Sequence, residues 1–234
     1  VGKNIQDHAY TGAYGLFEDE VYDDVGPGAC IAINDFNHRF PDVIGGGVLC
    51  NEFIRMPYQF TSIRPSGSRM WGKEHKDFQK HNFKRHIGIH GPVQEMPVFD
   101  KKVEVDPVVR DFWGLPVARI SGFRHDNDIK VGHFLADKAE EWLKEAGAIY
   151  TWQGVPGKES TPSQHQSGTC RMGNDPKTSV TNRYGQLHEI DNIFIADGSL
   201  HVNNGGYNPA LTILALGYWV GDHITEEWKG TKMK

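Results

Sequence analysis

Between residues 85 and 147 the hydrophobic pattern changes from a period of two to a period near four, and this change constrains the fold more than any other feature. Short alternating or β-branched runs come first, separated by Gly-Pro, Asp and Asp-Pro turn signals: His86 to His90, Val93 to Phe99 and Lys102 to Val105. A helix should follow from Asn127 or Asp128 to Gly147, because apolar residues recur at steps of three and four: Val131, Phe134, Leu135, Ala139, Trp142, Leu143 and Ala146. We therefore predict an antiparallel sheet with flanking helices, in the α+β or α/β class.

A second helix is predicted to open at Asn208 and Pro209. Asn is a favoured N-cap and Pro is preorganised for the first helical position. The apolar residues that follow carry the helix to about Ile224: Ala210, Leu211, Ile213, Leu214 and Leu216. The Gly205-Gly206 pair before this helix leaves room for a ligand or another backbone to approach closely.

The remaining segments carry weaker signals. Residues 1–47 and 151–173 lack a sustained hydrophobic period, so we predict irregular structure for both. Residues 193–196 form a short apolar run that predicts a strand, which should stop at Asp197-Gly198.

Composition narrows the class of partner. The formal net charge is -5 and the charges are interspersed, so the sequence predicts neither a basic face for nucleic acid nor a polybasic membrane patch. The longest apolar run, Ala210 to Val220, is too short for a transmembrane segment. No basic segment followed by an apolar one opens the sequence at Val1, so no signal peptide is visible. Small soluble partners are expected.

Cysteine and histidine positions bear on metal binding. Cys30, Cys50 and Cys170 are widely spaced and form no C-x-x-C pair, which favours free thiols over disulfides or a zinc site. His86 and His90 are four apart, as two helical ligands would be, but the alternation around them is that of a strand. Structural or substrate-facing roles are therefore favoured, and no metal site is predicted.

Three blocks near the end of the sequence have the types and spacing of a catalytic site: residues 165–173 (HQSGTCRMG), 193–199 (IFIADGS) and 206–212 (GYNPALT). Their order resembles the C-terminal pattern of GMC (glucose-methanol-choline) oxidoreductases. The opening residues 1–8 (VGKNIQDH) resemble that family's V-G-x-N-L-Q-D-H segment, and residues 101–116 resemble part of its substrate domain. The resemblance spans the sequence from end to end.

The resemblance implies a pair of catalytic residues and an FAD cofactor. Oxidation of an alcohol needs a base for the hydroxyl proton while hydride leaves the same carbon, and a neutral imidazole suits the first task. His165 would be that base, and Asn208 would hydrogen-bond and fix the hydroxyl. By the same resemblance, the residues that contact FAD are Asp197, Gly198, Pro209 and Ala210.

Structural interpretations stand beside these roles. His165 could stabilise a turn and Asn208 could only cap a helix, but their joint spacing beside Asp197-Gly198 favours the flavin site. Gln94 and Glu95, on a predicted strand, could contact a sugar, and a solvated strand face explains them equally well. We assign His8 no catalytic role, because a turn histidine is as plausible as one that covers the cofactor.

One part of a complete GMC enzyme is not found in the sequence. A G-x-G-x-x-G turn between a strand and a helix would cradle the FAD pyrophosphate, and the nearest candidates, residues 26–31 and 45–50, lack the final small residue. We therefore expect the C-terminal part of a longer enzyme, without the N-terminal Rossmann half. Residues 1–160 would be mostly substrate-binding domain and FAD-covering segments, and residues 161–234 the C-terminal portion of the FAD-binding domain.

The expected function is FAD-dependent oxidation of a sugar or sugar-like alcohol, with electrons passed to an acceptor other than oxygen. The segment at residues 35–47 is similar to bacterial sugar dehydrogenases of the GMC family, which implies a small companion subunit and a cytochrome or quinone acceptor. The same resemblance implies a periplasmic location, and a cytoplasmic one stays open. The alternative is a noncatalytic accessory or binding subunit that kept the fold. A histidine-rich metal hydrolase ranks lower, because no H-E-x-x-H motif is present.

Overall fold

The chain folds into two compact units with interleaved sequences. The computed structural model describes all residues except 22–27, 52–55, 160–163 and 233–234. Unit 1 is formed by three segments, Val1–Ala9, Gln94–Asp128 and Gly157–Lys234, and unit 2 by two, Tyr10–Val93 and Ile129–Pro156. The two units are therefore not separated by a single boundary near residue 160. The substrate-binding and FAD-binding roles expected for residues 1–160 and 161–234 stay predictions.

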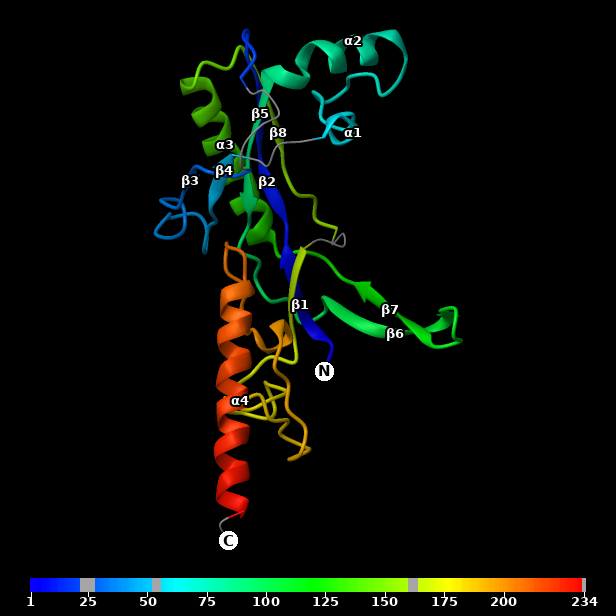
Figure 1. The fold of residues 1–234 in the computed structure, drawn as a ribbon, viewed down its shortest axis with the longest axis vertical. Coiled ribbons are helices and arrows are strands. Elements are labelled where there is room, and N and C mark those ends of the chain that lie inside the picture. Colours follow the sequence, from blue (N-terminus) through cyan, green and yellow to red (C-terminus); the bar gives the residue numbers. More distant parts are fainter. Residues whose placement is uncertain (22–27, 52–55, 160–163, 233–234) are drawn as a thin grey trace. The chain divides into compact units, whose positions relative to one another are not determined.

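Unit 1 contains a four-stranded antiparallel sheet in the order β7-β6-β1-β9 (Figure 1). Its strands are β1 (Lys3–His8), β6 (Lys102–Arg110), β7 (Pro116–Ser121) and β9 (Gln164–Thr169). The first strand of the chain thus lies between a hairpin from the middle of the sequence and a strand from its last third. The prediction of a strand from Lys102 is confirmed, although the strand is longer than expected.

Unit 2 contains a five-stranded antiparallel sheet in the order β3-β4-β5-β2-β8 (Figure 1). Its strands are β2 (Tyr10–Leu16), β3 (Ala32–Ile33), β4 (Leu49–Asn51), β5 (His86–Pro92) and β8 (Tyr150–Gly154). The strand predicted around His86 and His90 is confirmed. With two antiparallel sheets and a few helices, the chain has the α+β fold, which is one of the two predicted classes.

The sheet of unit 2 is covered by helix α3 (Asp126–Glu145), which begins in unit 1 and continues into unit 2. Val131, Leu135, Ala139 and Leu143, spaced by four, are buried completely or nearly so, which confirms the predicted apolar face. Close approach depends on Gly15, since a Cβ there would lie 3.1 Å from the Leu143 side chain. Three shorter helices complete the unit: α1 (Pro57–Phe60), α2 (Gly72–Asn82) and the 3₁₀ turn η1 (Phe83–Arg85).

The C-terminal part of unit 1 contains the 3₁₀ turn η2 (Gly198–Leu200) and the long helix α4 (Ala210–Lys232). The second predicted helix is thus confirmed and extends past Ile224. The strand predicted at residues 193–196 is wrong, because only Phe194 forms an isolated bridge, to Gln186. Among the described helices, none is both long and apolar enough to cross a membrane.

Three further segments differ from the sequence-based expectation. Residues 1–47 contain β1, β2 and β3, and residues 151–173 contain most of β8 and all of β9, where irregular structure was predicted. Gly26 and Pro27, which open one of the two glycine-rich candidates, lie outside the described residues. The strand predicted at residues 93–99 is absent: β5 ends at Pro92, and Pro97 has no N–H to offer a sheet.

The side chain of Glu95 makes hydrogen bonds that a strand at residues 93–99 could have made through its backbone. Its Oε2 accepts the backbone N–H of Asp7 at 3.2 Å and its Oε1 accepts that of Ala9 at 3.1 Å. A carboxylate therefore satisfies backbone N–H groups at the end of β1 and just after it, which a neighbouring strand would otherwise satisfy.

Glu95 belongs to a buried ionic cluster of four side chains. The Lys101 Nζ lies 2.6 Å from Glu95 Oε2 and 3.2 Å from Asp7 Oδ1, while the Arg124 Nε donates to Glu95 Oε1 at 2.9 Å. The exposed fractions of the Lys101 and Glu95 side chains are 2% and 1%. Arg124 also donates to the carbonyls of Gly157 and Glu159, so the cluster joins all three segments of unit 1.

The two carboxyl groups of the cluster titrate differently. Burial and the neighbouring Glu95 raise the pKa of Asp7 to about 6. Burial also acts to raise the Glu95 pKa, but hydrogen bonds from Asp7 and the Lys101 charge outweigh it and hold that pKa below its usual value. Glu95 is therefore the anion around which the cluster is organised.

Replacing Lys101 by Met tests how much the cluster contributes to stability. Removing one partner of a buried ion pair costs about 3 to 5 kcal/mol, so we expect a loss of that order in the unfolding free energy of the complete protein. The matched control is Lys102→Met, which removes a part-exposed pair with Glu104 and should cost about 1 kcal/mol or less. Urea unfolding measures both, and equal losses would contradict the assigned role.

Candidate functional site

His165 lies at a distorted position of β9. Its backbone has a φ of 65°, and that of Thr169, at the end of the same strand, is 72°. The pairing of β1 with β9 also shifts register twice, between Lys3 and Gln6 and between Gln6 and His8. Positive φ at residues other than glycine is uncommon, and bulges of this kind redirect side chains next to functional sites. The backbone is therefore strained at His165, the residue predicted to be the base.

The ring of His165 contacts a second histidine. His8, the last residue of β1, places its Nδ1 2.9 Å from the Nδ1 of His165, and the two rings meet edge to face with centroids 4.9 Å apart. The other ring nitrogen of His8, Nε2, lies 2.6 Å from the carbonyl oxygen of Gly205. His8 is completely buried. A chain of contacts thus runs from the Gly205 backbone through His8 to His165.

The loop that carries Gly205 is bound to both strands through Asn204. The Nδ2 of this buried side chain donates to the carbonyls of His165 at 3.1 Å and Asp7 at 3.4 Å. Its backbone N–H donates to Gln6 Oε1 at 2.7 Å, and Gln6 Nε2 donates back to the loop at Val202. Residues 201–208 are therefore fixed against β1 and β9.

A cavity of about 410 Å³ lies between this loop and the start of α4. It is lined by Met172, Leu200, His201, Val202, Asn203, Asn204, Gly205, Tyr207, Asn208, Pro209, Thr212 and Leu216. Two buried lining atoms, His201 Nε2 and Asn204 Oδ1, have no hydrogen-bond partner among the described residues. A cavity with buried, unpartnered polar atoms is suited to a ligand with polar groups.

Asn208 lines this cavity but does not cap α4 as predicted. The first helical hydrogen bond runs from the Ile213 N–H to the Pro209 carbonyl, so Pro209 occupies the capping position and the helix begins at Ala210. Asn208 is exposed and forms no capping hydrogen bond with any described residue. Its amide group is therefore available to a ligand in the cavity.

The other predicted FAD contacts fall into two groups. Pro209 lines the cavity and is buried, and Ala210 opens α4, where the first N–H groups have no partner within the helix. Asp197 and Gly198 lie at η2 instead, where the Asp197 side chain accepts the Ser199 N–H at 2.8 Å. Neither Asp197 nor Gly198 lines the cavity.

The two predicted substrate contacts, Gln94 and Glu95, lie apart from the cavity and outside any strand. Glu95 is 1% exposed and both its oxygens are bound within the ionic cluster, so it has a structural role in place of the predicted substrate contact or solvated face. Gln94 is half-buried, and its substrate role stays a prediction.

Burial sets the protonation of the histidines in this region. It lowers the pKa of His8 to about 4, although the Gly205 carbonyl acts in the opposite direction. Burial also lowers the pKa of His165 and that of His201 below the usual value for histidine. All three imidazoles are therefore neutral at pH 7, the state that a proton acceptor requires.

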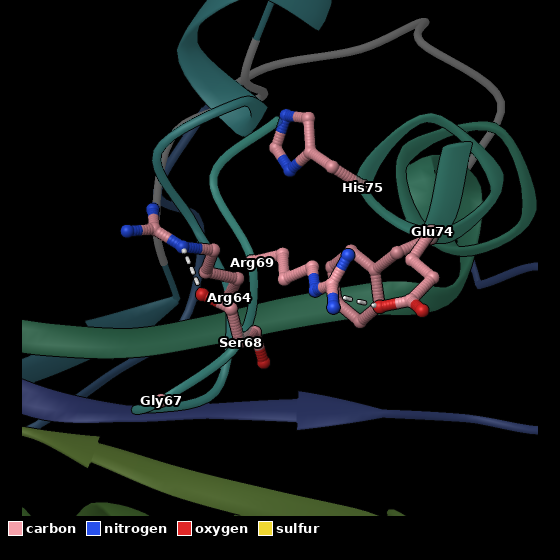
Figure 2. Close-up of a pocket in the computed structure, with 7 residues that line it drawn as sticks. Arg64, Gly67, Ser68, Arg69, Glu74 and His75 are labelled. Carbon is pink, nitrogen blue, oxygen red and sulfur yellow. Dashed lines mark hydrogen bonds and ion pairs between the residues drawn. The ribbon is translucent and has the colours of Figure 1, made fainter. Parts of the chain in front are cut away.

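A second pocket lies in unit 2, around the start of α2 (Figure 2). Arg64 and Arg69 line it, but the Arg64 Nε donates to the Ser68 carbonyl and Arg69 pairs with Glu74 at 3.4 Å. No predicted site residue lies there. In the described part of the chain no group of three or more His, Cys, Asp or Glu residues could hold a metal ion, and the three cysteines are free thiols.

Comparison with known proteins identifies the family. The family model of GMC oxidoreductases matches residues 100–217, half of the chain. The chain belongs to the GMC oxidoreductase family. This confirms the resemblance drawn from the blocks at residues 165–173, 193–199 and 206–212, all of which lie within the matched region.

Among GMC relatives, the chain is 36% identical to 2-methyl-1,2-propanediol dehydrogenase of Mycolicibacterium austroafricanum over 94% of its own length and 38% of the relative's. It is 29% identical to the gluconate 2-dehydrogenase flavoprotein of Pantoea cypripedii, over 86% and 34% of the two lengths. The chain thus spans little more than a third of each relative.

A solved structure shows a similar fold. Pyridoxine 4-oxidase from Mesorbium loti superimposes with a TM-score of 0.56 at 14% sequence identity, over 97% of this chain and 44% of that one. This GMC chain therefore shares an overall fold with that oxidase.

Sequence reasoning missed three residues of the site: His8, Gln6 and Asn204. His8 and Gln6 were part of the block that carried the family resemblance, so their position in that block was the available signal. Asn204 lies next to the conspicuous Gly205-Gly206 pair, but no local pattern shows that its side chain joins two strands.

Replacing Asn204 by Ala tests whether it holds the loop. The change removes hydrogen bonds to two buried carbonyls, so we expect a loss of about 1 to 3 kcal/mol in unfolding free energy. The exposed neighbour Asn203 provides a matched control, and Asn203→Ala should change stability by less than about 0.5 kcal/mol. Denaturant unfolding of the complete protein would refute the role if Asn204→Ala behaved like the control.

Proposed function

We propose that the complete protein is an FAD-dependent oxidoreductase that oxidises the CH–OH group of a sugar or sugar-like alcohol, with an electron acceptor other than oxygen. The proposal rests on a neutral His165, held on a distorted strand by a buried histidine, in the same unit as a polar cavity at the start of a long helix. The names of two relatives, a propanediol dehydrogenase and a gluconate dehydrogenase, support alcohol or sugar substrates.

The cavity residues fit part of an FAD molecule. The flavin ring carries carbonyl and N–H groups, which match the unpartnered Asn204 Oδ1 and His201 Nε2 and the free N–H groups at the start of α4. The positive end of the helix dipole favours negative charge on a ligand there. Pro209 and Ala210 would meet the flavin edge, and Asp197 and Gly198 would contact other polar groups of FAD. Bound FAD would supply the acceptor for the hydride.

His165 and Asn208 have separate tasks in this proposal. His165 takes the hydroxyl proton, which its neutral imidazole can accept near pH 7. Asn208 hydrogen-bonds the same oxygen and orients the carbon, and its freedom from helix capping leaves the amide available for this task. The amide of Asn208 does not titrate, so the hydrogen bond by which it positions the substrate does not depend on pH.

The noncatalytic accessory subunit is the second candidate, because the chain shows no dinucleotide-binding turn. A binding subunit would have no physical need for backbone strain at His165 together with a buried histidine contact. These two features favour the enzyme.

Replacing His165 by Ala tests the assignment of the base. A general base contributes about 10² to 10⁴ in rate, so the rate of flavin reduction by substrate in the complete protein should fall by that factor. Stopped-flow absorbance of the flavin measures it. His133→Ala, on the exposed face of α3, is the control and should leave the rate unchanged. A His165→Ala rate equal to that of the control would remove His165 from this role.

Replacing Asn208 by Ala separates positioning from capping. Loss of a hydrogen bond to the reacting oxygen is worth about 1.5 to 3 kcal/mol, so flavin reduction should slow by about 10- to 100-fold. Because Asn208 does not cap α4, the unfolding free energy should stay unchanged, whereas loss of a true cap costs about 1 kcal/mol. The opposite pattern, lower stability with an unchanged rate, would restore the capping interpretation.

A further inference from the structure

The contacts of His8 determine where the protons of the two histidines lie. A backbone carbonyl can only accept a hydrogen bond, so the 2.6 Å contact with the Gly205 oxygen requires a proton on His8 Nε2. His8 is completely buried, and burial lowers its pKa to about 4, so the ring is neutral at pH 7. A neutral imidazole has a single N–H, and the Nδ1 of His8 therefore carries a lone pair.

The proton between the two rings must then come from His165. Two ring nitrogens 2.9 Å apart need one proton between them, because two lone pairs at that distance repel. Since His8 Nδ1 has none, the Nδ1 of His165 carries it. His165 is also neutral, which leaves the lone pair on its Nε2.

We propose that His8 is a positioning residue that fixes the tautomer and ring orientation of His165, so that the Nε2 of His165 is the atom that accepts the substrate proton. This inference rests on the proposed function and deepens it. His8 was not expected from the sequence to have a role in catalysis, and the role proposed here is exerted only through His165.

The surrounding contacts keep this arrangement rigid. The carbonyl that orients His8 belongs to Gly205, next to Asn204, whose side chain is hydrogen-bonded to the strands on both sides. Asn204 donates to the backbone of His165 itself, so the same loop fixes the main chain of the base and, through His8, its ring. A shift of the loop would therefore disturb both together.

The proton balance of the step follows from these positions. The hydroxyl O–H bond breaks and an N–H bond forms at His165 Nε2, while the hydride leaves the same carbon for the flavin. His165 becomes a cation that keeps its Nδ1–H bonded to His8. His8 does not take that proton, because its own Nε2–H is held by the Gly205 carbonyl and its burial disfavours a positive charge.

Two substitutions of His8 in the complete, flavin-loaded protein test the proposal. In His8→Gln the amide N–H can donate to the Gly205 carbonyl and the amide oxygen can accept from His165 Nδ1, so the donor and acceptor of both hydrogen bonds are kept. In His8→Leu both contacts are lost at similar volume. We expect Leu to slow flavin reduction by about 10- to 100-fold with little change in substrate KM, as part of the 10² to 10⁴ that a base contributes, and Gln to recover most of the rate.

A direct measurement of the tautomer does not depend on activity. In protein labelled with ¹⁵N-histidine, NMR should show His165 protonated at Nδ1 and unprotonated at Nε2 in the parent and in His8→Gln, with mixed tautomers in His8→Leu. His165→Gln assigns the resonances. A parent His165 protonated at Nε2 would overturn the proposal, whether or not His8→Leu folds, and so would a Leu rate equal to the Gln and parent rates.

The same experiments separate failure of this proposal from failure of the proposed function. If His165→Ala slows flavin reduction and His8→Leu does not, the base stands and the role of His8 is wrong. If His165→Ala leaves the rate unchanged, the proposed base fails, and with it the catalytic meaning of the tautomer that NMR reports.

Discussion

The architecture of unit 1 depends on one buried ionic cluster. Its three segments come from the beginning, middle and end of the sequence, and the side chains of Asp7, Glu95, Lys101 and Arg124 join them. Charges inside a protein are costly unless they are paired and hydrogen-bonded, and here the Glu95 carboxylate has two cationic partners and two backbone N–H donors. The cluster has low energy only when all three segments are in place, so it specifies their arrangement.

The same cluster also positions the proposed site. Asp7 and Ala9 are bound by Glu95, and His8 lies between them on β1. Strand periodicity directs neighbouring side chains to opposite faces, so a residue between two anchored positions has a fixed direction. His8 is thus held by the cluster through its own backbone neighbours, and through His8 the cluster reaches His165 and the Gly205 loop. Stability and the geometry of the proposed site share one set of contacts.

Sequence reasoning succeeded where a local pattern is also a physical cause. The apolar stripe of α3 is visible in the sequence because apolar residues at helical spacing lie on one face, and that face is the one that becomes buried. The start of α4 is predicted from Asn208-Pro209 to within two residues. It failed for β1, whose buried Gln6, Asp7 and His8 are polar. A strand that is satisfied by hydrogen bonds and ion pairs has no hydrophobic alternation to detect. The opposite error was made for Glu95, which was predicted to lie on a strand because residues 93–99 have a strand-like pattern. Pro97 and the contacts of the Glu95 carboxylate with the backbone prevent strand pairing there.

Residue types at fixed spacings along the chain were enough to predict the family, an α+β or α/β class, and the two residues expected to carry the chemistry, His165 and Asn208. Only the tertiary structure decided that Pro209 and not Asn208 caps α4, that Glu95 is a structural anion, and that His8 faces His165. Each of these depends on partners between 4 and 157 positions away. Hydrogen bonding and desolvation act through space, so the protonation of a histidine is decided by groups that its neighbours in sequence do not reveal.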